Sequence, residues 1–258
     1  MRLFMNKITF LFIIIFIFAF IGAAFAEENI GKVLALKGKA VVERDKKKLT
    51  ARKNQNLLLK DAVSTMKASR TKMRFIDDSI LTLGENSKVA IKEYIYSKDK
   101  GGKSIFNLLD GKMRSVVGKT KFEIHTPTAV AAARGTIILS EVGRLAGKLF
   151  ATFICLEGEV IVTSADPGIQ GNKLLKAGMM ITVFEKEPLP EPTKAPPAEI
   201  EKLKKETEID LYEISIKRPK PRRIGTRGFS SVRTVGAPPI TQQPGAKATP
   251  IYIIMNFQ

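Results

Sequence analysis

Apolar and polar residues alternate in short runs between residues 31 and 186. In the segment 72–75, Lys-Met-Arg-Phe, every second side chain is apolar, the pattern of a strand with one buried face. The segments 80–83, 89–91, 121–125, 160–163 and 181–183 repeat this alternation or are rich in β-branched residues. Turn-forming residues separate them at 77–79, 84–86, 99–102, 110–111, 166–168 and 171–172. This order predicts an all-β domain over residues 27–186.

Two parts of this domain resemble each other. Residues 37–42, Lys-Gly-Lys-Ala-Val-Val, are followed by a variable loop and the pair Leu57-Leu58. Residues 157–162, Glu-Gly-Glu-Val-Ile-Val, are followed by another variable loop and the pair Leu174-Leu175. Repeated units of glycine and strand indicate successive coils, none of which buries its apolar face alone. We therefore expect a β-solenoid-like body of stacked short strands.

The pattern changes after residue 186. Residues 187–199 hold five prolines in thirteen residues, which predicts a stiff, extended linker. Residues 200–217 have apolar side chains near one face of a helix, with acidic residues at its start. Residues 218–258 carry seven basic residues and no acidic one and are rich in proline and glycine, so we expect a mostly disordered basic tail.

The first 26 residues have the layout of a cleaved signal peptide. Arg2 and Lys7 precede an apolar run that starts at Ile8, and the sequence Ala-Phe-Ala ends at Ala26, before Glu27. The alternative is an uncleaved membrane anchor, because about 20 apolar residues span a bilayer. Both hypotheses place the rest of the chain outside the cytoplasm. We expect a periplasmic or extracellular protein cleaved between Ala26 and Glu27.

The chain is strongly basic, with 43 Lys and Arg against 25 Asp and Glu. A basic exported protein favours anionic partners such as lipid headgroups, wall polymers or an acidic protein face, and nucleic acid is not expected in that compartment. The single cysteine, Cys155, excludes an internal disulfide. It lies in a continuous apolar run, which favours a buried thiol over a nucleophile.

Residues suited to catalysis or metal binding are few. His125 is the only histidine, whereas metal sites and hydrolytic triads draw on several such groups. Asp77 and Asp78 sit in a short turn without the repeated oxygen ligands of a calcium loop. No glycine spacing matches a phosphate-binding loop. The sequence thus predicts a protein with no catalytic, cofactor-binding or metal-binding residues.

Arg134 is the polar residue that stands out, because small and apolar residues surround it in the sequence. A buried guanidinium needs partners, so one interpretation is a pair with a nearby carboxylate (Glu123, Glu141 or Glu157), with Gly135 permitting a bulge or close chain approach. The other is that Arg134 binds a carboxylate of a ligand.

One ordered set of short segments lies between Gly31 and about Val183: residues 62–65, 74–77, 81–83, 109–114, 122–128, 133–136, 156–160 and 177–178. In this order and at these spacings, the segments resemble the FecR domain. The motif residues within them are Gly111, Thr126, Pro127, Thr128, Arg134, Gly135, Thr136 and Gly158. Asp78 departs from the family, which usually has glycine there, so we expect a strained turn at this position.

The resemblance implies a β-solenoid-like outer domain of the kind found in transmembrane regulators. In those proteins a cytoplasmic segment holds a sigma factor, and the outer domain receives a signal from an outer-membrane transporter. Only seven residues precede the apolar run here, and no clear second domain follows the β region. The chain is therefore more similar to freestanding, secreted FecR-domain proteins.

These observations predict an exported, non-enzymatic module that senses or scaffolds through an envelope protein partner. The alternative is a binder of anionic cell-wall polymer or of a membrane surface. Candidate contacts to an anionic partner lie in the basic tail: Arg218, Lys220, Arg222, Arg223, Arg227 and Arg233.

Overall fold

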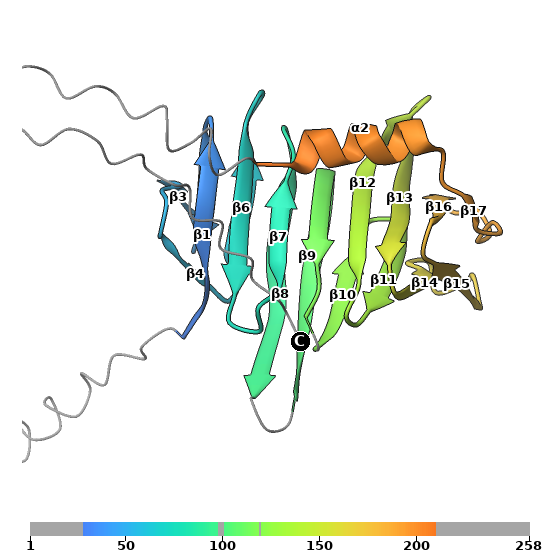
Figure 1. Cartoon of the computed structure of the whole chain (residues 1–258), viewed down its shortest axis with the longest axis horizontal. Helices are drawn as coiled ribbons and strands as arrows, with labels where there is room; N and C mark the ends of the chain where they lie inside the picture. The colour runs from blue at the N-terminus through green and yellow to red at the C-terminus, as the bar shows by residue number, and fades with distance from the viewer. Residues whose placement is uncertain (1–27, 98–100, 119, 210–258) are drawn as a thin grey trace, which may run out of the picture. The chain divides into compact units, whose positions relative to one another are not determined.

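The computed structural model describes residues 28–97, 101–118 and 120–209 (Figure 1). The chain divides into two units, Met1–Arg218 and Pro219–Gln258, and the described residues belong to the first. The predicted signal peptide, with Ala26 and Glu27 at its cleavage site, lies outside the described residues. The same holds for the basic tail and its six candidate contact residues.

The strands form two layers, which we call sheet A and sheet B. The order in sheet A is β4 (Asn56–Leu58), β1 (Asn29–Lys37), β6 (Arg70–Phe75), β7 (Ile80–Leu83), the second part of β9 (Gly101–Val116), β12 (Ile137–Leu145), β13 (Lys148–Glu157), β16 (Met179–Phe184) and β17 (Thr193–Lys194). The order in sheet B is β3 (Lys47–Thr50), β2 (Ala40–Arg44), β5 (Ala62–Thr65), β8 (Lys88–Ser97), the first part of β9, β10 (Lys121–His125), β11 (Ala129–Ala133), β14 (Glu159–Ser164) and β15 (Asn172–Lys176).

The predicted all-β class is confirmed. Because β9 pairs in both layers, the described strands form one continuous 17-stranded sheet. Its described pairings are antiparallel except for β9 with β10, which is parallel. The solenoid-like detail of the prediction is not confirmed, because the chain builds an open mixed sheet.

The main hydrophobic core lies between the two layers. The predicted strand with one buried face at residues 72–75 is confirmed, since Met73 and Phe75 are buried while Lys72 and Arg74 face outward. Phe75 of sheet A meets Phe106 of sheet B with ring centroids 4.9 Å apart, and Phe106 stacks on Phe122 at 5.1 Å. Burial of each such ring contributes about 1.5–3 kcal/mol, so these contacts join the layers strongly.

Glycines form corners where the chain crosses from one layer to the other. Gly38 (φ 77°) lies between β1 and β2, and Gly111 (φ 82°) lies inside β9. At each corner a side chain larger than hydrogen would collide with a serine, Ser69 or Ser87. The turn predicted at residues 110–111 is therefore wrong: Gly111 bends a 16-residue strand so that it belongs to both sheets. The left-handed φ explains why glycine is needed there.

One helix, α2 (Pro197–Thr207), lies on the outward face of sheet A (Figure 1). It starts three residues before the predicted range of 200–217, with Pro197 in its first turn. Proline is tolerated there because a backbone N–H in the first turn has no partner within the helix. It ends at Thr207, since Glu208 is extended (φ −88°, ψ 138°). Leu203 packs there against Leu139 and Ile154. No helix within the described ranges is long and apolar enough to cross a membrane.

Candidate interaction surface at Arg134

The structure separates the predicted motif residues into three places. Thr126, Pro127 and Thr128 form the turn between β10 and β11, where the Thr126 hydroxyl donates to the carbonyl oxygen of Ala129 at 2.7 Å. The amide of Ala129 donates back to that hydroxyl at 3.0 Å, so the motif closes a hairpin. Gly111 forms the corner in β9. Arg134, Gly135, Thr136 and Gly158 come together at a third place.

This third place is a crossing between the layers. Between β11 and β12 the chain passes from sheet B to sheet A, with Gly135 at φ 61°. The Gly135 amide donates to the carbonyl oxygen of Gly118 at 2.8 Å, and Thr136 is buried. Gly158 (φ 81°) packs so closely on Thr136 that a methyl group there would collide with it. Gly158 and the segment that holds Arg134, Gly135 and Thr136 therefore meet at one corner. The packing there is so close that position 158 requires glycine.

Arg134 itself is exposed, so the expectation of a buried guanidinium is wrong. The reason is the bend at Gly135, which places Arg134 at the rim of the layer crossing. Of the carboxylates considered as partners, Glu123 pairs with His125 and Lys103. Glu141 lies 3.7 Å from Lys112, on the other sheet.

A shallow hollow of about 470 Å³ lies beside Arg134 on the outward face of sheet B. Ala132 faces Ile161 across β11 and β14, and Ile161 faces Leu174 across β14 and β15. Ile161 is 48% and Leu174 45% exposed, so both present apolar surface to solvent. We call this site the Arg134 hollow; it is lined by Ala132, Ala133, Arg134, Glu159, Ile161 and Leu174.

The next strand adds charged side chains to this face. Glu123 lies opposite Ala132, and its carboxylate accepts a hydrogen bond of 2.8 Å from Nε2 of His125. Partial burial pushes the pKa of Glu123 upward, but the hydrogen bond from His125 and the charge of Lys103 outweigh it and hold the pKa below its usual range. Glu123 therefore stays ionised near neutral pH, with His125 as its hydrogen-bond partner.

Ile161 and Leu174 were not predicted as site residues from the sequence. A signal for Ile161 was present, because Val160 and Val162 are buried and alternation then turns the intervening side chain outward. Leu174 follows the same rule beside buried Leu175. Both side chains lie near Arg134 because β11 pairs with β14. This pairing joins segments some 30 residues apart in the sequence.

The other candidate residues serve the fold. The buried Asp77 carboxylate accepts hydrogen bonds from the hydroxyls of Ser79 (3.0 Å) and Thr120 (2.7 Å). Asp78, where a strained turn was expected, has a left-handed backbone conformation with φ 63°. Cys155 is buried, and this burial raises the pKa of its thiol. In the part of the chain that the structure describes, no three His, Cys, Asp or Glu side chains group to hold a metal ion.

Residues 61–161 match the model of the FecR protein family, which confirms the resemblance over that range. No curated protein shows significant similarity to the chain. Two crystal structures of a "putative anti-sigma factor" from Parabacteroides distasonis ATCC 8503, at 1.65 and 2.50 Å resolution, are similar, each with a TM-score of 0.43. Their sequences are 11% and 10% identical to this chain, and each match covers 54% of this chain and 62% of the other.

Proposed function

Because residues 61–161 carry a FecR domain, we propose that this chain is an exported, non-catalytic signalling module that binds a protein partner in the bacterial cell envelope. The family is regulatory, which supports a signalling role. The observation that carries the proposal is the Arg134 hollow, where two of the family motifs meet beside exposed apolar side chains.

The hollow has the composition of a protein interface. Ile161 and Leu174 supply apolar surface to its lining, and Arg134 and Glu159 supply opposite charges. Apolar side chains beside an arginine are typical of binding hot spots, in which arginine is enriched. At sheet B, surface contact is favoured over strand addition, because lysines protect its outer strands: Lys47 and Lys48 on β3 and Lys173 and Lys176 on β15.

Affinity purification from the native envelope tests this function. The tagged full chain is compared with the double variant Ile161→Asp, Leu174→Asp and with a chain that ends at residue 217. We expect the full chain and the shortened chain to retain the same envelope protein and the double variant to lose it. The control is Leu145→Asp, an exposed apolar residue in the β12–β13 hairpin. Retention by the double variant, or no partner with any form, would contradict the proposal.

A second candidate function, binding of an anionic wall polymer or lipid surface, has its own support. A hollow of about 540 Å³ beside β3 has three basic residues in its lining, Lys48, Arg52 and Lys53. Sedimentation with purified wall or anionic vesicles tests it, with Lys48→Glu, Lys53→Glu as the variant. We expect pelleting at low salt that ends near 1 M salt, where the screening length falls to about 3 Å. No pelleting at low salt excludes this function.

Export rests on the amino-terminal pattern of basic, apolar and small residues. The mass of the protein purified from the envelope fraction tests it. We expect a chain that starts at Glu27 and a periplasmic or extracellular location. A chain that retains Met1 and fractionates with the membrane would support the anchored alternative.

A further inference from the structure

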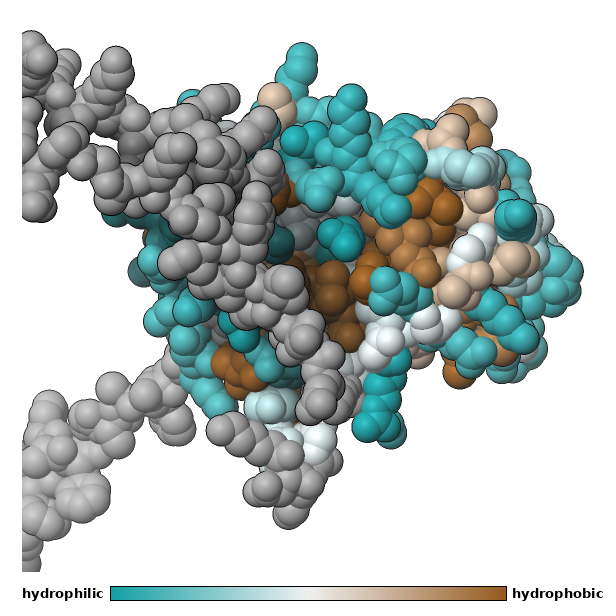
Figure 2. Space-filling view, in the orientation of Figure 1, coloured by the Kyte–Doolittle hydropathy of each residue, from teal (hydrophilic) through white to brown (hydrophobic). Residues whose placement is uncertain are grey.

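A row of β-branched side chains crosses the outward face of sheet A next to α2. Ile80 lies directly opposite Val116, and Val116 directly opposite Ile137, on strands β7, β9 and β12. All three are half-buried, and neither of the described apolar clusters includes them. Figure 2 shows apolar side chains gathered below the helix on this face. We call these three residues the apolar row.

Basic side chains flank the apolar row. Lys72 and Arg114 each lie opposite Thr82, and Arg74 lies opposite Ile80. Arg74 pairs with Asp78 at 2.6 Å. The Nε of Arg114, in contrast, is buried and has no hydrogen-bond partner among the described residues. A buried donor without an acceptor is destabilising, so this position favours an acidic occupant.

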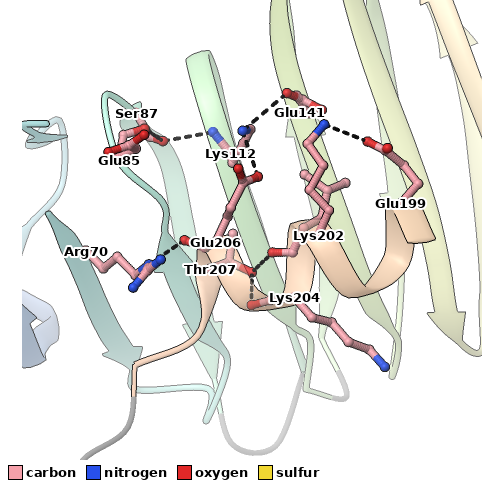
Figure 3. Close-up of polar contacts among 11 residues, drawn as sticks. Arg70, Glu85, Ser87, Lys112, Glu141, Glu199, Lys202, Lys204, Glu206 and Thr207 are labelled. Carbon is pink, nitrogen blue, oxygen red and sulfur yellow. Dashed lines mark hydrogen bonds and ion pairs between the residues drawn. The ribbon is translucent and has the colours of Figure 1, made fainter. Parts of the chain in front are cut away.

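The chain leaves α2 at the edge of this same face (Figure 3). The Glu206 carboxylate lies 2.7 Å from Nζ of Lys112, which is on the same strand as Val116, and Nε of Arg70 donates to the Glu206 carbonyl oxygen at 2.6 Å. Three residues later, Ile209 is only 6% exposed. The backbone from the end of the helix to Ile209 therefore stays close to the protein surface instead of turning into solvent.

We propose that residues 210–216, Asp-Leu-Tyr-Glu-Ile-Ser-Ile, dock along this face. Their apolar side chains cover the apolar row, and the carboxylates of Asp210 and Glu213 face Lys72 and Arg114. This segment is acidic and apolar, whereas residues 218–258 have no acidic residue to offer Arg114. The division of the chain falls after Arg218, so the segment belongs to the same unit as sheet A.

The reach of the segment fits this path. Lys112 and Val116 are four residues apart on β9, which corresponds to about 13 Å along a strand. Seven extended residues span about 23 Å, so a chain that starts beside Glu206 reaches the apolar row. The short tether also gives this segment a high effective concentration at the face, on the order of millimolar. The docking is independent of the Arg134 hollow, which lies on sheet B.

Tryptophan fluorescence of the full chain tests the docking, because the natural chain has no tryptophan. The probe is Leu211→Trp, and the matched control is Ile240→Trp in the basic tail. We expect emission at shorter wavelength and several-fold weaker acrylamide quenching for the probe than for the control. Adding Arg114→Glu should release the probe, and further adding Glu213→Arg should restore its protection, because the charge pair is re-formed with opposite signs.

Each alternative occupant gives a distinct result. Equal quenching of the probe and the control overturns the proposal. Protection that appears only at high protein concentration indicates a second copy and also overturns it. Protection that survives both Arg114→Glu and Val116→Glu places the segment elsewhere and equally overturns it. Thermal unfolding of each variant verifies the fold.

Binding of an apolar dye is a second measurement of the docking. A chain that ends after Ile209 should bind more dye than a chain that ends after Lys217, because only the longer chain can cover the apolar row. Equal binding contradicts the docking.

Discussion

The guanidinium of Arg70 and the main-chain carbonyl oxygen of Glu206 are 136 residues apart in sequence and joined by a hydrogen bond of 2.6 Å. The Glu206 carboxylate also pairs with Lys112, which in turn lies 3.7 Å from Glu141. These contacts fasten the end of α2 across strands β6, β9 and β12 (Figure 3). The helix is thus part of the folded body and not an appendage on a linker.

Removal of Lys112 tests this attachment. Lys112→Ala leaves the carboxylates of Glu141 and Glu206 facing each other, and the Lys112 side chain is only 20% exposed. We expect the free energy of unfolding to fall by about 1–2 kcal/mol, between the values of exposed and buried pairs. The control is Lys204→Ala, an exposed pair with Glu201 within the helix, expected to cost less than about 0.5 kcal/mol. Urea unfolding measures both; equal losses would contradict this role of Lys112.

The corner at Gly111 gives a second prediction. Gly111→Ala forces a left-handed conformation on alanine and a collision with Ser87, so we expect a loss of about 2–4 kcal/mol. Gly147→Ala is the matched control, because Gly147 has a similar φ of 84° but no atom within 4 Å of the added methyl group. Its expected loss is about 1–2 kcal/mol. Thermal unfolding compares them, and a control as damaging as Gly111→Ala would show that steric crowding is unimportant at the corner.

The depressed pKa of Glu123 predicts how stability depends on pH. A carboxyl whose folded pKa lies below its unfolded value of 4.5 stabilises the fold fully above that value. This stabilisation is lost as the pH falls through the folded pKa. Glu123→Gln should therefore lower stability near neutral pH by up to about 1 kcal/mol and flatten the acid limb of the curve. Denaturation between pH 3 and 7, with exposed Glu157→Gln as control, measures this; parallel curves for Glu123→Gln and the natural chain would refute it.

Cys155 should be unreactive in the folded protein. Its side chain is buried, its pKa is raised by that burial, and its thiol lies 3.3 Å from the carbonyl oxygen of Gly158. Because the thiolate is the reactive form, we expect no labelling by a thiol reagent until the protein unfolds. Absorbance after addition of the reagent, with and without urea, measures this. Rapid labelling of the native protein would show that the Gly158 corner opens.

Local patterns predicted the strands but neither the corners nor how the segments meet. Alternation at Lys72 and Met73 correctly identified the buried face, because side-chain direction in a strand is a local property. Gly38 and Gly158 suggested stacked coils, but at each of them the chain crosses from one layer to the other. A left-handed glycine is compatible with a coil corner and with a layer crossing, so its presence does not distinguish them. The hollow beside Arg134 depends on the register of β11 with β14, which no local pattern specifies.

Site-specific photo-cross-linking in living cells tests the central claim most directly. A photoreactive residue replaces Ile161 in the Arg134 hollow or, as control, Leu145, which is 61% exposed at a distant hairpin. The account predicts one discrete cross-linked envelope protein from position 161, none from position 145, and loss of the product when Arg134→Glu is added. No product from position 161, or the same products from both positions, would contradict it.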